Sequence, residues 1–181
     1  MKITELEIPE VKIITPDVYS DYRGYYMESY SKRTLEKFGI TDNFVQDNHF
    51  YSIKKGTIRG IHFQNNPYAQ SKLLRCTKGV ILDVAVDLRK NSPTYKKYVM
   101  VELSEENKKQ IYIPKGFGHC AMALTDNVEG QYKVDEFYYP EYDRAIAWND
   151  PELNIDWGTD QFVVSEKDKN APFLKDSDVN F

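Results

Sequence analysis

The run Thr57-Ile-Arg-Gly-Ile-His-Phe-Gln64 places a cation and an imidazole in one short segment that reads as a β-strand. His62 carries the one side chain type whose unperturbed pKa lies near neutral pH, and Arg59 is always charged. Side chains alternate along a strand, so Arg59, Ile61 and Phe63 are expected on one face, and Ile58, Gly60, His62 and Gln64 on the other. Gly60 leaves room for close approach by another group. The run predicts a pocket wall, although a lone histidine is more often an ordinary half-buried side chain.

Other segments carry side chains of the same kind, suited to proton transfer or to holding a polar ligand. Each of them alone is weak support for a site, because a tyrosine is usually a packing residue and a lysine is usually solvated. The set comprises Arg23, Glu28, Gln46, Asn48, Lys72, His119, Tyr132, Tyr138, Lys167 and Asp168.

The segments that must position these residues are short and rich in β-formers. They are separated by turns such as Lys-Lys-Gly56 and Asn-Asn-Pro67. A single short helix is expected after Ser31, through Phe38 and closed by Gly39. From Pro140 the chain becomes polar and irregular, and we expect this tail to pack over the sheet edge. Strands are predicted at 11–15, 25–30, 44–51, 57–64, 71–77, 80–87, 98–103, 110–114, 118–124 and 131–138.

Eight or more short antiparallel strands with little helix predict an all-β fold, either a double-sheet jelly roll or an open barrel. A length of 181 residues fits one domain that buries its own core. The mouth of such a fold is a usual place for a small-molecule site.

Composition excludes several classes of function. A net charge of -4 with interleaved signs leaves no basic stripe for a nucleic acid. The first ten residues hold three glutamates and resemble no signal peptide, and no later run is long enough to cross a membrane. Cys76 and Cys120 are isolated, which indicates neither a disulfide framework nor a zinc knuckle. We therefore expect a cytoplasmic protein that binds neither nucleic acid nor membrane.

Five motifs together resemble the dTDP-4-dehydrorhamnose 3,5-epimerase family from about residue 17 to residue 172. They are Asp21-x-Arg-Gly24, Arg59-Gly-Ile-His-Phe-Gln64, Asp83-x-Ala-Val-Asp-Leu-Arg89, Ile113-Pro-x-Gly-Phe-x-His119 and Trp148-Asn-Asp-Pro151. The resemblance implies a single cupin-type jelly roll over 1–181 with a few short helical turns. It also implies a homodimer, with residues of about 1–30 shared across the dimer and a polar segment at about 150–181.

The reaction implied by the resemblance is epimerisation of dTDP-4-dehydro-6-deoxy-D-glucose at C3 and C5, without metal or cofactor. This isomerase would serve dTDP-rhamnose biosynthesis for lipopolysaccharide or another cell-surface polysaccharide. The C4 ketone acidifies the protons at C3 and C5, so the reaction needs a base, a group that holds the enolate oxygen, and an acid on the opposite face.

The family pattern assigns the catalytic roles to four residues. His62 matches the base and Asp168 the aspartate that orients it, while Tyr132 matches the proton donor and Lys72 the cation near the C4 oxygen. Ser165 and Asp168 also read as a helix N-cap with an acidic third residue, a role compatible with the catalytic one.

The remaining matches concern the nucleotide sugar. Tyr138 matches the aromatic that stacks on thymine, and Arg23 and Glu28 match residues that reach into the partner subunit's pocket. The other expected binding residues are Gln46, Asp47, Asn48, Arg59, His119, Asp143 and Lys167. Two departures stand out. Cys120 replaces a glycine beside His119, and Asp143 replaces a glutamate, which leaves open an epimerase of C3 or C5 alone, or of another nucleotide-linked keto sugar.

Two rival classes share the expected fold. A metal-dependent cupin would have to assemble its ligands from His49, His62 and His119, which are not clustered in the sequence. A non-catalytic sugar-binding jelly roll would need neither a proton acceptor nor a proton donor. Metal analysis separates the first rival, and solvent-deuterium exchange into a keto sugar separates the second.

Overall fold

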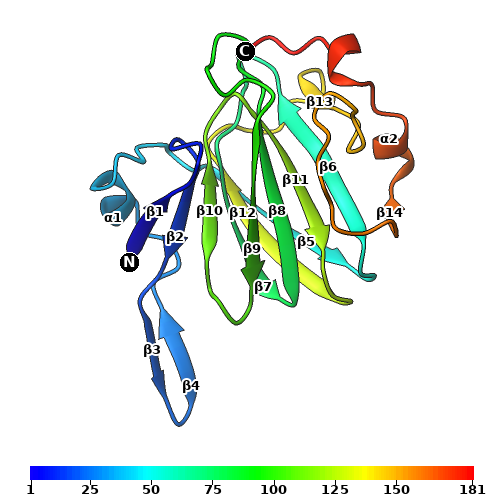
Figure 1. Ribbon diagram of the computed structural model, residues 1–181. Helices are drawn as coiled ribbons and strands as arrows, with labels where there is room; N and C mark the ends of the chain where they lie inside the picture. The colour runs from blue at the N-terminus through cyan, green and yellow to red at the C-terminus, as the bar shows by residue number, and fades with distance from the viewer.

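Two antiparallel sheets face each other in the computed structural model, which describes residues 1–181 (Figure 1). The first sheet has the order β1-β2-β10-β7-β12-β5, with bounds Lys2–Glu5, Lys12–Thr15, Gln110–Ile113, Lys72–Lys78, Val128–Val134 and Gln46–Ser52. The second has the order β13-β6-β11-β8-β9, with bounds Asp143–Ala145, Thr57–Gln64, Phe117–Ala123, Val80–Asp87 and Tyr98–Ser104; β14 (Val163–Val164) joins β6 in parallel. The expected all-β jelly roll is confirmed.

The main core lies between the sheets, because each strand turns its apolar side chains inward on alternate residues. Leu74 and Ile111 of the first sheet belong to the same buried cluster as Ala85, Val99 and Phe117 of the second.

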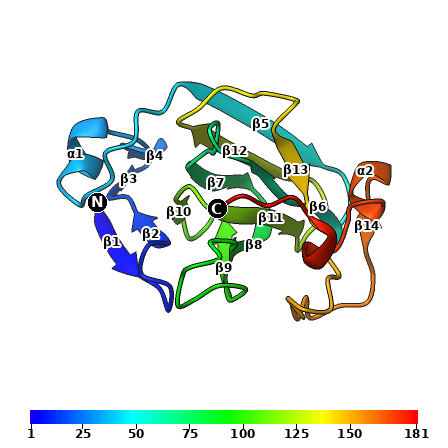
Figure 2. The ribbon, with the colours of Figure 1, turned by 90° about the horizontal axis from the view of Figure 1, so that it is seen from above.

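The outer faces of the two sheets are covered by different segments. Helix α1 (Lys32–Glu36) covers part of the first sheet, where Leu35 packs with Leu73. Its N-cap is Ser31, as predicted, whose hydroxyl accepts from Thr34 N at 3.3 Å. The C-terminal segment covers the second sheet and carries α2 (Glu166–Lys169) and a 3₁₀ turn, Leu174–Asp176. Seen from above, α1 and α2 lie at opposite ends of the molecule (Figure 2).

The C-terminal segment is more apolar in its contacts than its composition indicates. The expectation that it packs over a sheet edge was incomplete, because Leu153, Trp157, Leu174 and Val179 are buried against the outer face of the second sheet. A second difference concerns β12, which ends at Val134 and leaves residues 135–142 as a loop. Asp135 is the reason, since its carboxylate accepts from Ser71 N at 2.6 Å in place of a ladder partner.

A hairpin of β3 (Val18–Asp21) and β4 (Gly24–Met27) projects away from both sheets (Figure 1). The segment before it does not project. Strands β1 and β2 pair with each other and with β10 of the same chain, and Ile14 of β2 is buried. Within the N-terminal 30 residues, the hairpin and the exposed free edge of β1 are both open to another molecule.

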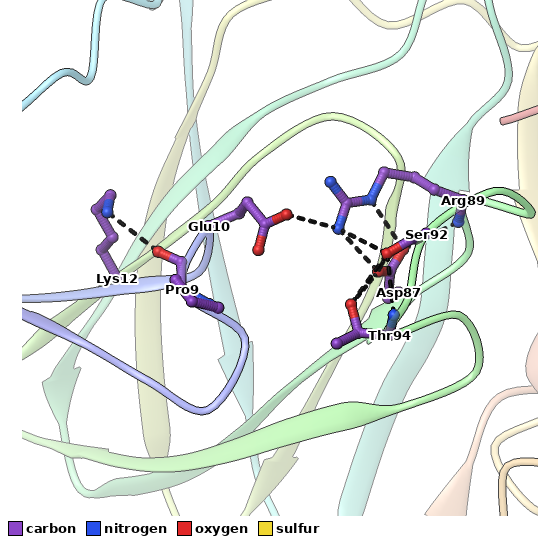
Figure 3. A network of polar contacts seen from close by, with 7 residues as sticks. All are labelled: Pro9, Glu10, Lys12, Asp87, Arg89, Ser92 and Thr94. Atoms are coloured by element: carbon purple, nitrogen blue, oxygen red, sulfur yellow. Dashed lines mark hydrogen bonds and ion pairs between the residues drawn. The ribbon is translucent and has the colours of Figure 1, made fainter.

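A buried carboxylate fixes the connection between β8 and β9 (Figure 3). Asp87 accepts from Arg89, Ser92 and Thr94, and Arg89 also reaches Glu10 at 3.1 Å. Burial raises the pKa of Asp87, but these hydrogen bonds outweigh it and lower the pKa to about 2. The carboxylate therefore stays charged and holds Arg89, whose guanidinium links the N-terminal turn to the end of β8.

Candidate active site

A cavity of about 570 Å³ opens between the sheets and is lined by residues from β5, β6, β7, β11 and β12 and from the C-terminal segment. Nine of the fourteen residues predicted from the sequence line it: Arg59, His62, Lys72, His119, Tyr132, Tyr138, Asp143, Lys167 and Asp168. No other cavity collects so many of them.

A bulge in β6 brings Arg59 and His62 to the same cavity. In the ladder with β11, His62 pairs with His119 and Arg59 pairs with Ala121, so three residue steps on β6 oppose two on β11. Strict alternation predicted opposite faces for Arg59 and His62, and this prediction was wrong. Ile58 and Ile61 instead share the outer cluster under the C-terminal segment.

Gly60 makes the bulge possible. Its φ is +132°, and a Cβ at this position would lie 2.5 Å from the carbonyl oxygen of His119 and 2.7 Å from Cα of Cys120. A glycine is therefore required both for its backbone conformation and for the close approach of β11. The close approach at Gly60 was predicted from the sequence, but the bulge, which reverses the alternation of side chains after Gly60, was not.

His62 and Asp168 form a short contact across the cavity wall. Nε2 of His62 lies 2.6 Å from Oδ1 of Asp168, which is 3% exposed. Burial raises the pKa of Asp168, but the hydrogen bond and charge of His62, together with Ser165 and Gly60, lower it overall. An ionised Asp168 can only accept, so the Nε2–H of His62 donates to it and the lone pair of the imidazole lies on Nδ1.

Asp168 also has its expected place in α2. Its backbone N–H donates to Oγ of Ser165 at 3.1 Å, so Ser165 is the N-cap and Asp168 the third helical residue. The capping role and the contact with His62 occur together in one residue.

His119 has a carboxylate partner of its own. Its Nε2 lies 2.8 Å from Oδ2 of Asp83, and burial lowers the pKa of His119. Asp83 is fully buried, and its second oxygen, Oδ1, has no hydrogen-bond partner. Asp83 stands within one of the five motifs but was not among the residues predicted for the site. A charged residue inside the apolar run Val80–Asp87 was the available signal.

Lys72 and Tyr132 approach the cavity from the first sheet. Lys72 is 7% exposed and its Nζ donates only to the backbone oxygen of His62, at 3.4 Å. Burial lowers the pKa of Lys72 to about 8, against the opposing charges of Asp83 and Asp143. Burial raises the pKa of Tyr132, which keeps its hydroxyl protonated at neutral pH.

The mouth of the cavity holds Tyr138, Asp143 and Lys167. Asp143 Oδ2 accepts from Lys167 Nζ at 2.5 Å and from the Tyr138 hydroxyl at 3.3 Å, and Tyr138 is 54% exposed. Asp143, whose side chain is shorter than the glutamate of the family pattern, therefore bonds directly to both Lys167 and Tyr138. Cys120, the other departure, does not touch this region, because its side chain lies in the outer cluster on the opposite face from His119.

Five of the predicted residues do not line the cavity. Gln46 and Asn48 lie on β5 beside β12, with Gln46 Nε2 donating to Asn48 Oδ1 at 2.9 Å. Asp47 points to the other face, where it binds Lys133 at 2.7 Å.

The other two residues are at the hairpin. Arg23 is at its tip, in an ion pair with Asp21 at 2.6 Å, and Glu28 follows β4 and accepts from Thr34.

The arrangement suits proton transfer in a pocket that carries several cationic side chains. It presents an oriented imidazole, a protonated phenol and a buried ammonium group, with Arg59 and Lys167 nearer the opening for an anionic ligand. No group of three or more histidine, cysteine or acidic side chains is placed to hold a metal ion.

Comparison with known proteins places the chain in one family. The family model described as dTDP-4-dehydrorhamnose 3,5-epimerase matches residues 5–176. The enzyme of that name from Pseudomonas aeruginosa is 47% identical over 180 residues, 98% of each chain, and the one from Shigella flexneri is 46% identical over 179 residues, 98% of each chain.

Solved structures agree with the sequence relatives. The Bacillus anthracis epimerase with TDP and pyrophosphate bound superposes with a TM-score of 0.93 at 45% identity, covering 95% of this chain and 98% of that one. The Legionella pneumophila epimerase in complex with dTDP-4-keto-L-rhamnose gives 0.93 at 44% identity, covering 98% and 94%. A 3'-monoepimerase from Streptomyces bikiniensis, in complex with dTDP-quinovose, is more distant, with 0.88 at 30% identity over 94% and 87%. The chain therefore belongs to the dTDP-4-dehydrorhamnose 3,5-epimerase family.

Proposed function

We propose that this epimerase inverts C3 and C5 of a dTDP-linked 4-keto-6-deoxy sugar with His62 as the base and Tyr132 as the acid. The protein is an isomerase of the 3,5-epimerase type, and relatives at 46–47% identity over the whole chain carry that activity in their names. The observation that carries the assignment of roles is the contact of His62 with the buried Asp168 in the wall of the cavity that Tyr132 also lines.

The proposed steps follow from the chemistry of the ketone. Nδ1 of His62 takes the proton from the carbon next to C4, the electron pair moves to the C4 oxygen, and an enolate forms. The ammonium group of Lys72, which is itself buried, stabilises that oxyanion. Tyr132 then gives its hydroxyl proton to the opposite face of the same carbon, so that the C4 carbonyl re-forms and the centre is inverted. His62 loses its proton to solvent and the Tyr132 phenolate takes one up before the second carbon reacts.

Binding of the nucleotide is assigned to the opening of the cavity. Arg59, Lys167 and His119 hold the pyrophosphate and sugar, and Tyr138 stacks on the base. Support for a dTDP-linked substrate comes from relatives whose structures contain TDP or a dTDP-sugar.

A homodimer is part of the proposal because the hairpin carries aromatic side chains that its own chain does not cover. Tyr19, Tyr22, Tyr25 and Tyr26 are 57–97% exposed, an unusual load of aromatic surface for two short strands. A partner's pocket would bury them and receive Arg23 and Glu28.

The expected cytoplasmic location also remains part of the proposal; both cysteines are free and buried, and no helix is long and apolar enough to span a bilayer.

Proton NMR of the purified protein with dTDP-4-keto-6-deoxyglucose in deuterium oxide tests the reaction. Exchange at both C3 and C5, with formation of the inverted sugar, is the expected result. Exchange at one carbon only would make the protein a monoepimerase, and no exchange would leave it a binding protein.

A further inference from the structure

The side-chain amide of Gln64 is bonded on all sides by the backbone of two loops. Its Nε2 donates to the carbonyl oxygens of Tyr68, at 2.7 Å, and Phe137, at 3.1 Å, while its Oε1 accepts from Tyr139 N at 2.7 Å. Gln64 is 2% exposed, so all three bonds are made away from bulk water. Both donor hydrogens and the acceptor of the amide are used.

Two of these bonds, to the loop of residues 135–142, lie on either side of Tyr138. Phe137 and Tyr139 are its chain neighbours, and one amide fixes the carbonyl of the first and the N–H of the second. A planar amide that holds both flanking peptide groups restricts the backbone rotation that aims the intervening side chain. Gln70 adds a further bond to the same loop, from its Nε2 to the backbone oxygen of Glu136 at 2.8 Å.

The other tyrosines of this loop are turned inward. Tyr139 stacks on Tyr68 with 3.9 Å between ring centroids, and Tyr142 meets the same ring edge-on at 4.7 Å. Tyr138 makes no such aromatic contact, and 54% of it is exposed at the cavity mouth. These neighbours anchor the loop, and the ring of Tyr138, whose hydroxyl donates to Asp143, is left exposed to a ligand.

Gln64 also joins this loop to the catalytic strand. It lies on β6 two residues after His62, lines the same cavity, and pairs across the ladder with Asp143 of β13. Gln64 therefore fixes the position of Tyr138 relative to β6, the strand that carries the proposed base.

We propose that Gln64 is a positioning residue that sets the geometry of Tyr138 for stacking on the nucleotide base, through its bonds to Phe137 and Tyr139. The proposal rests on the proposed contact of Tyr138 with the base. It assigns to Gln64 no contact with the substrate's reacting atoms. A role in binding the nucleoside, distinct from a general role in folding, follows from it.

Binding of dTDP and of inorganic pyrophosphate by Gln64→Met separates the two roles. Methionine keeps the length and volume of the side chain but can make none of the three bonds. We expect the affinity for dTDP to fall on the order of tenfold, the size of a weakened base stack, while the affinity for pyrophosphate is unchanged. In turnover, KM should rise by a similar factor with kcat within about twofold, the pattern of lost ground-state binding.

A double-mutant cycle with Tyr138→Ala links the effect to Tyr138. If Gln64 acts through Tyr138, the double variant should bind dTDP no more weakly than Tyr138→Ala alone. The positioning role would be overturned if the two single variants' losses of dTDP affinity added in full in the double variant. It would also be overturned if Gln64→Met lowered pyrophosphate affinity as much as dTDP affinity. If Gln64→Met does not fold, Gln64→Glu replaces it, because this change removes both donors and keeps the acceptor for Tyr139 N. A carboxylate in the cavity lining repels dTDP and pyrophosphate alike, so this variant is judged by its loss of dTDP affinity relative to that of pyrophosphate and by the cycle with Tyr138→Ala.

The control is Asn65→Leu. Asn65 is the next residue, is 3% exposed, and its amide clamps the C-terminal tail at Asp178 and Asn180 instead of the tyrosine loop. The Asn65→Leu variant should leave the ratio of dTDP affinity to pyrophosphate affinity unchanged. If Tyr138→Ala lowers dTDP affinity but Gln64→Met does not, the positioning role fails and the base contact stands. If Tyr138→Ala has no effect, the base contact itself fails, and the role of Gln64 with it.

Discussion

His62 and His119 face each other directly across β6 and β11, and each is bonded to a different aspartate. The two pairs differ in exposure, since the side chain of His62 is 30% exposed and that of His119 is 9% exposed. Burial lowers the pKa of His119, so it is suited to act as a neutral hydrogen-bonding group. The more accessible imidazole is the one that a substrate carbon can reach, which favours His62 as the base.

Asp168→Asn should reduce kcat by about 10²–10⁴-fold, because an amide at this position no longer stabilises the imidazolium that forms on His62. The stability effect has a defined sign. The folded pKa of Asp168 is lowered, so its stabilising contribution is present above the unfolded pKa and is lost as pH falls through the folded value. Urea unfolding at several pH values should show the gap between wild type and variant closing below about pH 4.

The control for that variant is Glu166→Gln, on the same helical turn but with its side chain 82% exposed. It should change neither the rate nor the pH dependence of stability beyond about 0.5 kcal/mol. An Asp168→Asn enzyme with the wild-type rate would contradict the role assigned to Asp168.

Lys72 should give the pH profile of kcat/KM an alkaline limb near pH 8, since its pKa is lowered by burial to about 8 and the neutral amine cannot stabilise the enolate. Tyr132, whose pKa is raised, stays protonated across this range. In Lys72→Arg the limb should move to higher pH, whatever the residual rate, because guanidinium does not titrate there. A limb that stays in place in this variant would assign it to another group.

The burial of Lys72 also determines how the free energy of unfolding should change with pH. Between about pH 8 and 10.5 the unfolded chain binds a proton at this lysine that the folded chain has lost, so the unfolding free energy rises with pH in that window. Relative to Lys72→Met, the wild type should gain stability as the pH is raised from 8 to 10. A flat difference would indicate an ordinary lysine pKa.

Much of this architecture could be predicted from the sequence, because period-two alternation and turn residues specify short strands independently of their partners. The bulge at Gly60 could not, since it depends on how closely β11 approaches, which is a property of two strands. The same limit explains Asp83, whose partner His119 is 36 residues away, and Gln64, two of whose three partners are 73 and 75 residues away. Local pattern gives the element, and tertiary pairing gives the site.

Gly60→Ala should destabilise the protein by about 2–5 kcal/mol, the sum of backbone strain at φ +132° and the clash with β11. It should also lower activity in the remaining folded fraction, because the bulge sets Arg59 beside His62. Gly39→Ala is the control: its φ is +80°, nothing lies within 4 Å of the added Cβ, and it lies outside the hairpin proposed to meet the partner, so only backbone strain of about 1–3 kcal/mol should remain. Equal losses measured by denaturant unfolding would contradict the packing argument.

Subunit complementation tests the shared pocket without disturbing the fold. A chain with Arg23→Ala and a chain with His62→Ala should each be weakly active as homodimers. In the mixed dimer, one pocket combines the intact His62 of one chain with the intact Arg23 of its partner, so co-expressed chains should recover about one quarter of wild-type activity. Co-expression of His62→Ala with Tyr132→Phe is the control, because both residues line the pocket of their own chain. Recovery in the control, or none in the test, would contradict the shared site.

The division of labour between base and acid predicts two different defects. In His62→Ala no proton can be removed from C3 or C5, so turnover and deuterium exchange should both fall by about 10²–10⁴-fold while dTDP still binds. In Tyr132→Phe the base remains and the ring still packs in the cavity, so exchange on the face of His62 should partly persist. Inversion needs a proton from the opposite face and should be largely lost. Proton NMR in deuterium oxide reports both quantities in one sample. Inversion at the wild-type rate by Tyr132→Phe, or undiminished exchange by His62→Ala, would show that the acid and the base are other residues.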